Sequence, residues 1–301
     1  MTTKRIFTYG CSFGRWRWPC WPDMVQKNFG DEYKYIKNSN AGLGNQGIFY
    51  MMLEDDLHFK FTEDDIILVG WSGWAREDRL QDNGFWECYG NLLTSPNPDK
   101  YGEEYVKKYW SMSNDIMRNT SAIIAANKMF NITHQHHIFD YDNLEDNNAQ
   151  SKTYKLMNKL NWKTEPASSR YNFNQHWANL PEKELFNDNK GYEHNSRFDG
   201  RVLDNHPDII AQLEHTTAVL EKIGLTMKQE TIDFYTQEYQ RVIDYIDNSD
   251  PIKRELLQDG NWDCFSETFK ILFTDIDEHS TGPYTQKIII KNFKKQFHKY
   301  T

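Results

Sequence analysis

The stretch Ile6-Phe7-Thr8-Tyr9-Gly10-Cys11-Ser12-Phe13-Gly14 decides how the rest of the sequence is interpreted, because it predicts a strand that ends in a sharp turn. Its β-branched and aromatic residues favour a strand, and a Gly-x-Ser-x-Gly turn can expose a serine hydroxyl at the edge of a sheet. The glycines allow the backbone to bend and to pass close to neighbouring elements. Ser12 is therefore a candidate nucleophile, and an ordinary strand-to-loop turn that contains a serine is the alternative.

The composition describes a folded and acidic chain. Of its 301 residues, 15% are aromatic, and the net charge is −9. The aromatic content is too high for a disordered chain, and the acidic balance argues against a protein that wraps nucleic acid. No signal peptide is visible, and no run approaches the roughly 18 apolar residues of a membrane span. We therefore expect a cytoplasmic protein with free thiols, which binds neither nucleic acid nor a membrane.

Two more loops follow predicted strands further along the chain. Residues 33–37 lead into a glycine- and amide-rich loop at 38–47, and the apolar run at 66–69 leads into a loop at 70–77. A continuous apolar run is typical of a strand that is buried on both faces of a parallel sheet. Helices are expected at 22–28, 48–57, 101–130 and 207–223. Strands that alternate with helices predict an α/β domain with a mostly parallel sheet, whose ligands collect at the carboxyl ends of the strands.

The remaining segments do not continue this alternation. A polar insertion is expected at about 143–200, with one helix at 152–160. The domain is expected to end at residue 225, and residues 226–301 are expected to form a mostly helical C-terminal extension. The extension would pack on the domain or on a second copy of the chain, which would make a homo-oligomer.

A group of three histidines invites a metal interpretation. Residues 138–139 favour a strand, and a strand alternates its faces, so His134 and His136 would share one side while His137 lies on the other. The four cysteines show no zinc spacing. We expect no metal site, and metal binding by His134 and His136 is the alternative.

Serine chemistry requires a hydroxyl, an imidazole, a carboxylate and N–H donors for the oxyanion, and the chain offers candidates for all four in order. This ordered set resembles the SGNH (GDSL-like) hydrolase family over residues 4–223. Gly10-Cys11-Ser12-Phe13-Gly14 resembles the first block of the family, with the nucleophile at Ser12 and with Cys11 in place of the usual aspartate. Trp21-Pro22 resembles the Trp-Pro that often follows this block.

Two glycine-containing loops resemble the blocks that form the oxyanion hole. Asn40-Ala41-Gly42-Leu43-Gly44-Asn45 resembles the second block, whose glycine supplies an N–H; Gly44 is the first choice and Gly42 the reserve. Val69-Gly70-Trp71-Ser72-Gly73 stands in the place of the third block, with Ser72 where the family has asparagine. A serine hydroxyl can donate, but it is shorter than an amide and rotates more freely. The resemblance implies an oxyanion hole of Ser12, Gly44 and Ser72.

Asp204-Asn205-His206-Pro207 resembles the last block, which pairs an aspartate with the catalytic histidine. The spacing is Asp-x-His here, whereas the family usually has Asp-x-x-His. Asp204 is the nearest carboxylate, and Asp199 is the fallback. The resemblance therefore implies a triad of Ser12, His206 and Asp204.

The resemblance implies a three-layer α/β/α sandwich of the flavodoxin-like SGNH kind and hydrolysis of a small-molecule or carbohydrate ester, for example an O-acetyl group on a sugar, without a cofactor. Trp16 and Trp71 would suit sugar stacking, and plain packing is the alternative. Arg76 would bind an anionic substrate group, and a salt bridge to Glu77 or Asp78 is the alternative. Acyl transfer would use the same residues, and a non-catalytic binding or assembly module would retain the scaffold alone.

Overall fold

The computed structural model describes residues 4–16, 18–73, 76–80, 86–91, 108, 112–137, 196–197, 202–203 and 206–248. Its strands are β1 (Arg5–Gly10), β2 (Lys34–Ser39), β3 (Ile66–Trp71), β4 (Arg76–Leu80), β5 (Trp86–Asn91), β6 (His134–His137), β7 (Ser196–Arg197) and β8 (Val202–Leu203). Its helices are α1 (Trp21–Phe29), α2 (Asn45–Phe59), α4 (Met112–Met129), α7 (Ile209–Lys222) and α8 (Gln229–Asn248), with a 3₁₀ turn at Gly30–Glu32. No helix in this described part of the chain is long and apolar enough to cross a membrane.

The central sheet has the strand order β2-β1-β3-β6, and all of its pairs are parallel. Strand β1 lies between β2 and β3, with Gly10 opposite Ser39 and Tyr9 opposite Val69. The chain moves to one side of β1 to form β2 and then crosses back to form β3. Such a reversal of strand order leaves a crevice at the carboxyl ends of the strands, and this is where open α/β sheets bind ligands. The predicted α/β domain with a mostly parallel sheet is confirmed.

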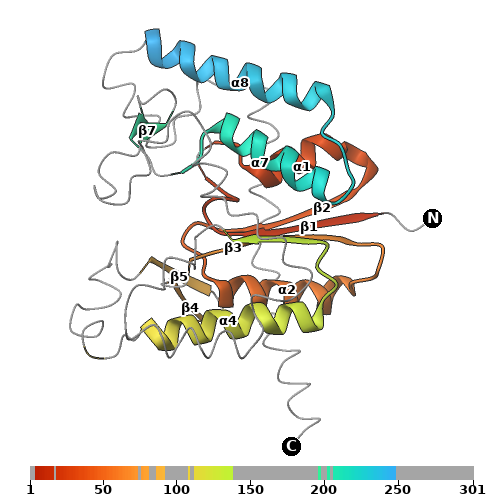
Figure 1. Cartoon of the computed structure of the whole chain (residues 1–301), viewed down its shortest axis with the longest axis vertical. Coiled ribbons are helices and arrows are strands. Elements are labelled where there is room, and N and C mark those ends of the chain that lie inside the picture. The colour runs from red at the N-terminus through yellow and green to blue at the C-terminus, as the bar shows by residue number, and fades with distance from the viewer. Residues whose placement is uncertain are drawn as a thin grey trace, which may run out of the picture.

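Helices cover both faces of this sheet (Figure 1). Helices α1, α7 and α8 lie on one face, and α2 and α4 lie on the other. Ile6 and Leu68 join the core under the first group, whereas Phe7 and Ile67 join the core under the second. Neighbouring strand residues thus point to opposite cores, as the pleat requires. The apolar run of β3 is buried on both faces, as its sequence predicts.

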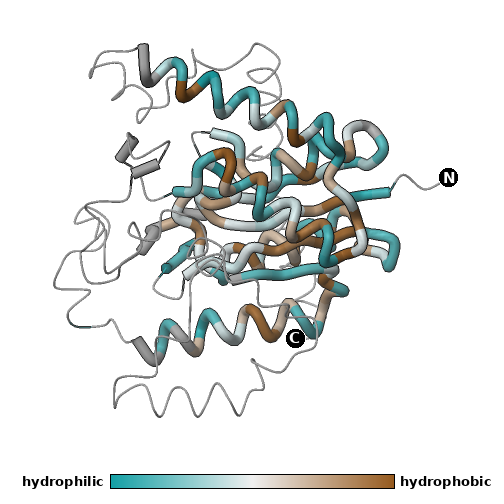
Figure 2. Tube along the Cα trace, turned by 45° about the horizontal axis from the view of Figure 1, so that its top comes forward, coloured by the Kyte–Doolittle hydropathy of each residue, from teal (hydrophilic) through white to brown (hydrophobic). Residues whose placement is uncertain are grey.

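Helix α8 belongs to the same core as α1 and α7. Tyr235 and Val242 are buried in the cluster that contains Trp21, and the Tyr235 hydroxyl donates a hydrogen bond of 3.0 Å to the Asp23 carbonyl. Figure 2 shows hydrophobic residues at intervals along α8, the uppermost helix, as expected for one buried side. The part of the expected extension that the structure describes therefore packs on the core beside α1 and α7. The rest of the expected extension, 249–301, lies outside the described residues. Of the expected insertion at 143–200, only β7 is described, and it pairs with β8.

Strands β4 and β5 form an antiparallel hairpin that the sequence interpretation missed. Residues 70–77 were expected to be a loop, whereas β4 begins at Arg76. The dipeptide Asn83-Gly84, between the two strands, is a strong hairpin signal that could have identified it. The hairpin is a two-stranded sheet separate from the central one, and it carries Asp78.

Two adjacent carboxyl groups on α2 predict how stability depends on pH. Burial raises the pKa of Glu54 to about 8 and that of Asp55 to about 7, although Tyr9 and Asn38 donate hydrogen bonds to Asp55. Because both pKa values lie above those of the unfolded chain, the folded state binds more protons, and its stability falls as the pH rises from about 5 to about 8. We expect the midpoint of thermal unfolding to fall over this range in the wild type and to change less in Glu54→Gln. A midpoint that rises with pH equally in both proteins would contradict this assignment.

Candidate active site

Ser12 lies just beyond the end of β1, the strand beside the switch point of the sheet. The turn is closed by the Gly14 amide, which donates a hydrogen bond of 2.8 Å to the Cys11 carbonyl. A Cβ atom on Gly14 would lie 2.5 Å from the Ser39 Oγ atom, and one on Gly10 would lie 3.2 Å from it. Close approach to β2 therefore explains the glycines on both sides of Ser12. Within the described residues the Ser12 amide makes no hydrogen bond.

The fold brings His206 onto the loop that follows Ser12. The His206 ring stacks on the Trp16 ring with centroids 3.4 Å apart and an interplanar angle of 16°. The Phe13 ring lies 5.3 Å from the same imidazole, centroid to centroid. His206 is buried, and it lies three residues before α7 begins. Two of the predicted catalytic residues, far apart in sequence, thus come from segments that touch.

Hydrogen bonds fasten these two segments together. The Gln212 side chain donates to the Phe13 carbonyl at 3.1 Å and accepts from the Trp21 amide at 2.9 Å. The Trp18 indole N–H donates to the carbonyl of Pro207, the residue after His206. Residues 207–212 therefore hold the loop after Ser12 at both of its ends, which fixes His206 relative to that loop.

Helix α7 begins at Ile209, two residues later than expected. Pro207 was expected in its first turn, but Asp208 is the N-cap residue, and its Oδ1 atom accepts a hydrogen bond of 2.9 Å from the Ala211 amide. An aspartate side chain satisfies an unpaired N–H at this position better than a proline can. The helix ends as expected before Gly224, whose φ of 75° is in the left-handed region.

The triad is not closed by hydrogen bonds within the described residues. No hydrogen bond joins the Ser12 hydroxyl to the His206 ring in this part of the chain. Asp204 and the fallback Asp199 both lie outside the described residues. Catalytic hydrogen bonds are often long or poorly aligned without substrate and tighten when it binds. The structure therefore supports the meeting of the Ser12 and His206 segments and leaves the carboxylate as a prediction.

Gly44, the expected oxyanion donor, is engaged by a carboxylate. Its amide donates to both Asp78 oxygens, at 2.9 and 3.0 Å, and the Gly47 amide donates to Asp78 Oδ2 at 2.9 Å. Burial raises the pKa of Asp78, although the two amides and the charges of Arg76 and Arg118 act in the opposite direction. Asp78 was considered only as a salt-bridge partner of Arg76, because nothing in the sequence places it beside α2.

Asn45 is a second residue whose role was missed. Its Nδ2 atom donates to the Ser72 carbonyl at 2.9 Å, and its Oδ1 atom accepts from the Ser72 amide at 2.6 Å. This reciprocal pair ties the loop after β3 to the first turn of α2, so the predicted second and third blocks are joined. The backbone N–H of Ser72 is thereby occupied. Any contribution of Ser72 to an oxyanion hole would come from its hydroxyl.

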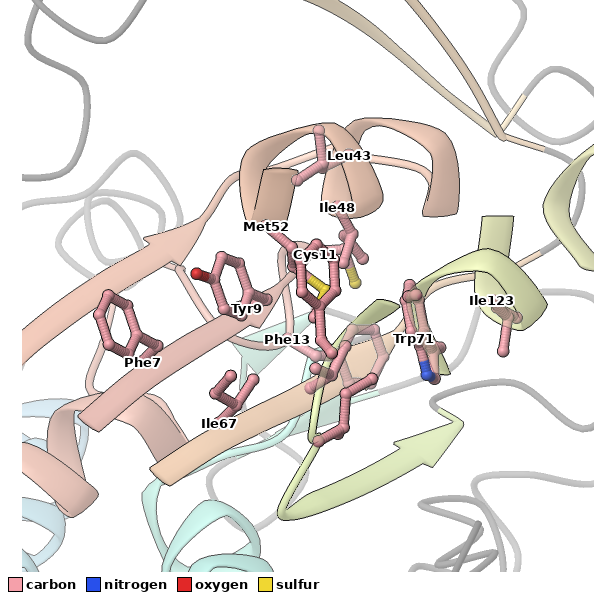
Figure 3. Packing of buried hydrophobic residues seen from close by; sticks show 14 of the residues in the cluster. Phe7, Tyr9, Cys11, Phe13, Leu43, Ile48, Met52, Ile67, Trp71 and Ile123 are labelled. Atoms are coloured by element: carbon pink, nitrogen blue, oxygen red, sulfur yellow. The ribbon is translucent and has the colours of Figure 1, made fainter. Parts of the chain in front are cut away.

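Of the three expected substrate contacts, Trp71 lies in the core. It is fully buried, and Figure 3 shows it among the hydrophobic residues of that core. Its indole N–H donates to Gln135 Oε1 at 2.6 Å. This burial favours the packing alternative for Trp71. Trp16 is partly exposed, but one face of its ring is covered by His206. Arg76 donates to the Leu43 carbonyl at 3.3 Å and lies close enough to Asp78 to affect its pKa, which agrees with the ion-pair alternative.

No protein-family model and no curated protein matches this chain. The choice of a function therefore depends on the geometry around Ser12, His206 and Gly44.

His134 and His136 of β6 form a buried cluster with His215 of α7. His134 and His136 lie on the same side of the strand, with ring centroids 6.0 Å apart, and His136 packs 4.4 Å from His215 of α7. Burial, and secondarily the charge of Lys222, lowers the pKa of His134 to about 4. No group of three or more histidine, cysteine, aspartate or glutamate side chains within the described residues could hold a metal ion.

Proposed function

We propose that this chain is a serine esterase of the SGNH kind, built as a three-layer α/β/α sandwich. The observation that carries the proposal is the stacking of His206 on Trp16. Trp16 lies four residues after Ser12, and Ser12 follows the carboxyl end of β1. The resemblance pairs Ser12 with His206, and their two segments, which are distant in sequence, lie together at one edge of the sheet. Helices on both faces of a parallel sheet with the order β2-β1-β3-β6 support the same family of folds.

The proposed reaction proceeds through an acyl-enzyme. The Ser12 hydroxyl oxygen attacks the ester carbonyl carbon while His206 accepts the hydroxyl proton, and the N–H groups of Ser12 and Gly44 stabilise the oxyanion. His206 then gives the proton to the departing alkoxide, which leaves as an alcohol. Water attacks the acyl group with His206 as the base, and the acid and free Ser12 are released. Asp204 is the proposed partner that orients His206.

Labelling of the serine tests this proposal directly. A fluorophosphonate is expected to modify Ser12, and the wild type is expected to hydrolyse p-nitrophenyl acetate. Ser12→Ala should remove the labelling and reduce turnover on the order of 10⁴-fold or more, because an alanine cannot form the acyl-enzyme. Turnover that is equal in wild type and Ser12→Ala, or labelling at another residue only, would exclude Ser12 as the nucleophile.

The contact between Gly44 and Asp78 favours a second candidate function, which is a binding or assembly module that retains the scaffold without catalysis. In that case the proposed oxyanion donor is permanently engaged, and Asp78 only caps α2. The labelling experiment separates the candidates, because a module predicts no modification of Ser12. If Ser12 is reactive, comparing the products formed with and without a sugar acceptor would distinguish hydrolysis from acyl transfer.

A further inference from the structure

The proposed oxyanion and the observed Asp78 carboxylate both need the amide proton of Gly44. The Gly44 amide has a single proton, and that proton points to the two oxygens of Asp78. An oxyanion needs a donor of its own as its charge develops, and loss of one such donor costs about 100- to 1000-fold in rate. A carboxylate held at the same position would also repel the oxyanion, since like charges destabilise each other in a buried site.

Space around Gly44 is equally restricted. A Cβ atom on Gly44 would lie 2.8 Å from Asp78 Oδ2 and 3.1 Å from Arg76 Cβ. Strand β4 therefore packs directly on this glycine, and its side chains occupy the room that a substrate oxygen would need. Turnover through Gly44 requires that Asp78 first leave.

We infer that Asp78 is an internal inhibitor of the proposed esterase: its carboxylate occupies the Gly44 N–H in the resting state, and its withdrawal exposes the oxyanion donor to the substrate. This inference rests on the proposed function. It assigns to the β4–β5 hairpin a regulatory contact with the active site.

The surroundings of Asp78 allow this withdrawal. Its strand belongs to a two-stranded sheet that shares no ladder with the central sheet, so β4 can shift without breaking the hydrogen bonds of β1 or β3. The hairpin is held to α4 by Arg118, which donates to the Arg76 carbonyl at 3.3 Å and lies 3.6 Å from Glu77. When β4 carries the carboxylate away, the charge of Arg118 on α4 stays near the freed amides. That positive environment suits a developing oxyanion.

Two variants of Asp78 and a matched control test the inference. Asp78→Asn keeps the shape of the side chain and removes its charge, and Asp78→Ala removes the acceptor entirely. Asp65→Asn is the control, because Asp65 is buried to the same 6% exposure and also accepts charged hydrogen bonds, from Arg5, but lies before β3 at the opposite edge of the sheet. The rate at which a fluorophosphonate modifies Ser12 is measured for each protein, with Ser12→Ala as the blank.

We expect Asp78→Ala to be labelled on the order of 10- to 100-fold faster than the wild type, Asp78→Asn to show a smaller acceleration, and Asp65→Asn to show none. The amide proton resonances of Gly44 and Gly47, observed with ¹⁵N-glycine, should move in both Asp78 variants and remain in place in Asp65→Asn. These resonances report the contact in the folded protein independently of catalysis.

The possible outcomes distinguish failure of the inhibitory role from failure of the proposed function. If the wild type is labelled at Ser12 and neither Asp78 variant is faster, the esterase proposal survives and the inhibitory role is wrong. Slower labelling in both variants would also overturn the inhibitory role, because it would make Asp78 a residue that holds Gly44 in place. If no variant is labelled while the glycine resonances move as expected, the proposed function fails, and the inhibitory role fails with it.

Discussion

Replacing His206 with alanine is expected to lower Ser12-dependent ester turnover on the order of 10⁴-fold, because the serine hydroxyl loses the base that we propose accepts its proton. The imidazole lies against Trp16 and Phe13, so its removal leaves a space beside an aromatic ring that free imidazole can enter. Added imidazole should therefore restore part of the activity. The double variant Ser12→Ala/His206→Ala should be no less active than either single variant, since residues that act as a unit are not additive.

The control for this experiment is His58→Ala. His58 lies in the last turn of α2, at the opposite end of that helix from Gly44, and its loss should leave turnover unchanged. Circular dichroism and thermal unfolding would show whether His206→Ala retains the fold. Turnover close to that of the wild type in folded His206→Ala would remove His206 from the mechanism, whatever the behaviour of Ser12.

The largest loss of stability is expected from Lys37→Met. Lys37 Nζ lies 2.6 Å from Asp23 Oδ1, and both side chains are almost completely buried. Asp23 Oδ2 also accepts a hydrogen bond of 2.8 Å from the Cys20 amide at the start of α1. Without Lys37 the Asp23 carboxyl group is left in the core with no ionic partner. We expect the free energy of unfolding, measured with urea, to fall by about 3–5 kcal/mol.

Removing the charge of Asp23 as well should recover much of the lost free energy of unfolding. In Asp23→Asn/Lys37→Met the asparagine oxygen can still accept from the Cys20 amide, and the charge is gone. Replacing both members of a buried ion pair is often neutral or stabilising, whereas removing one member is costly. The double variant should therefore be more stable than Lys37→Met alone. Equal stability of Lys37→Met and wild type would show that the pair is not buried in solution.

Much of the fold could be predicted from local patterns. The apolar run of β3 and the glycine turn after β1 each predicted an element that the structure contains. The pairing of Ser12 with His206 rests on the resemblance of their two sequence blocks, and it stays a prediction. Trp71 could also have been placed in the core, because it continues the alternation of Ile67 and Val69 on one buried face of β3.

The contacts around Gly44 could not be predicted in the same way. Asp78 reaches the start of α2 from a hairpin 34 residues further along the chain, and no periodic pattern specifies that approach. The pairing of Asn45 with the Ser72 backbone likewise depends on how two loops meet in space. Local propensity determines elements, whereas such polar contacts are decided by tertiary packing. These contacts determine which N–H groups are available to a substrate.

The bridge made by Gln212 has a consequence for how the protein is synthesised. It joins Phe13 to a residue 199 positions later, so the loop after Ser12 acquires its support only once α7 has left the ribosome. Chains grow from the N-terminus at about 5–20 residues per second, so β1 and Ser12 wait on the order of ten seconds or longer for their partner. During that interval the loop after Ser12 lacks the hydrogen bonds that Gln212 makes to the Phe13 carbonyl and the Trp21 amide.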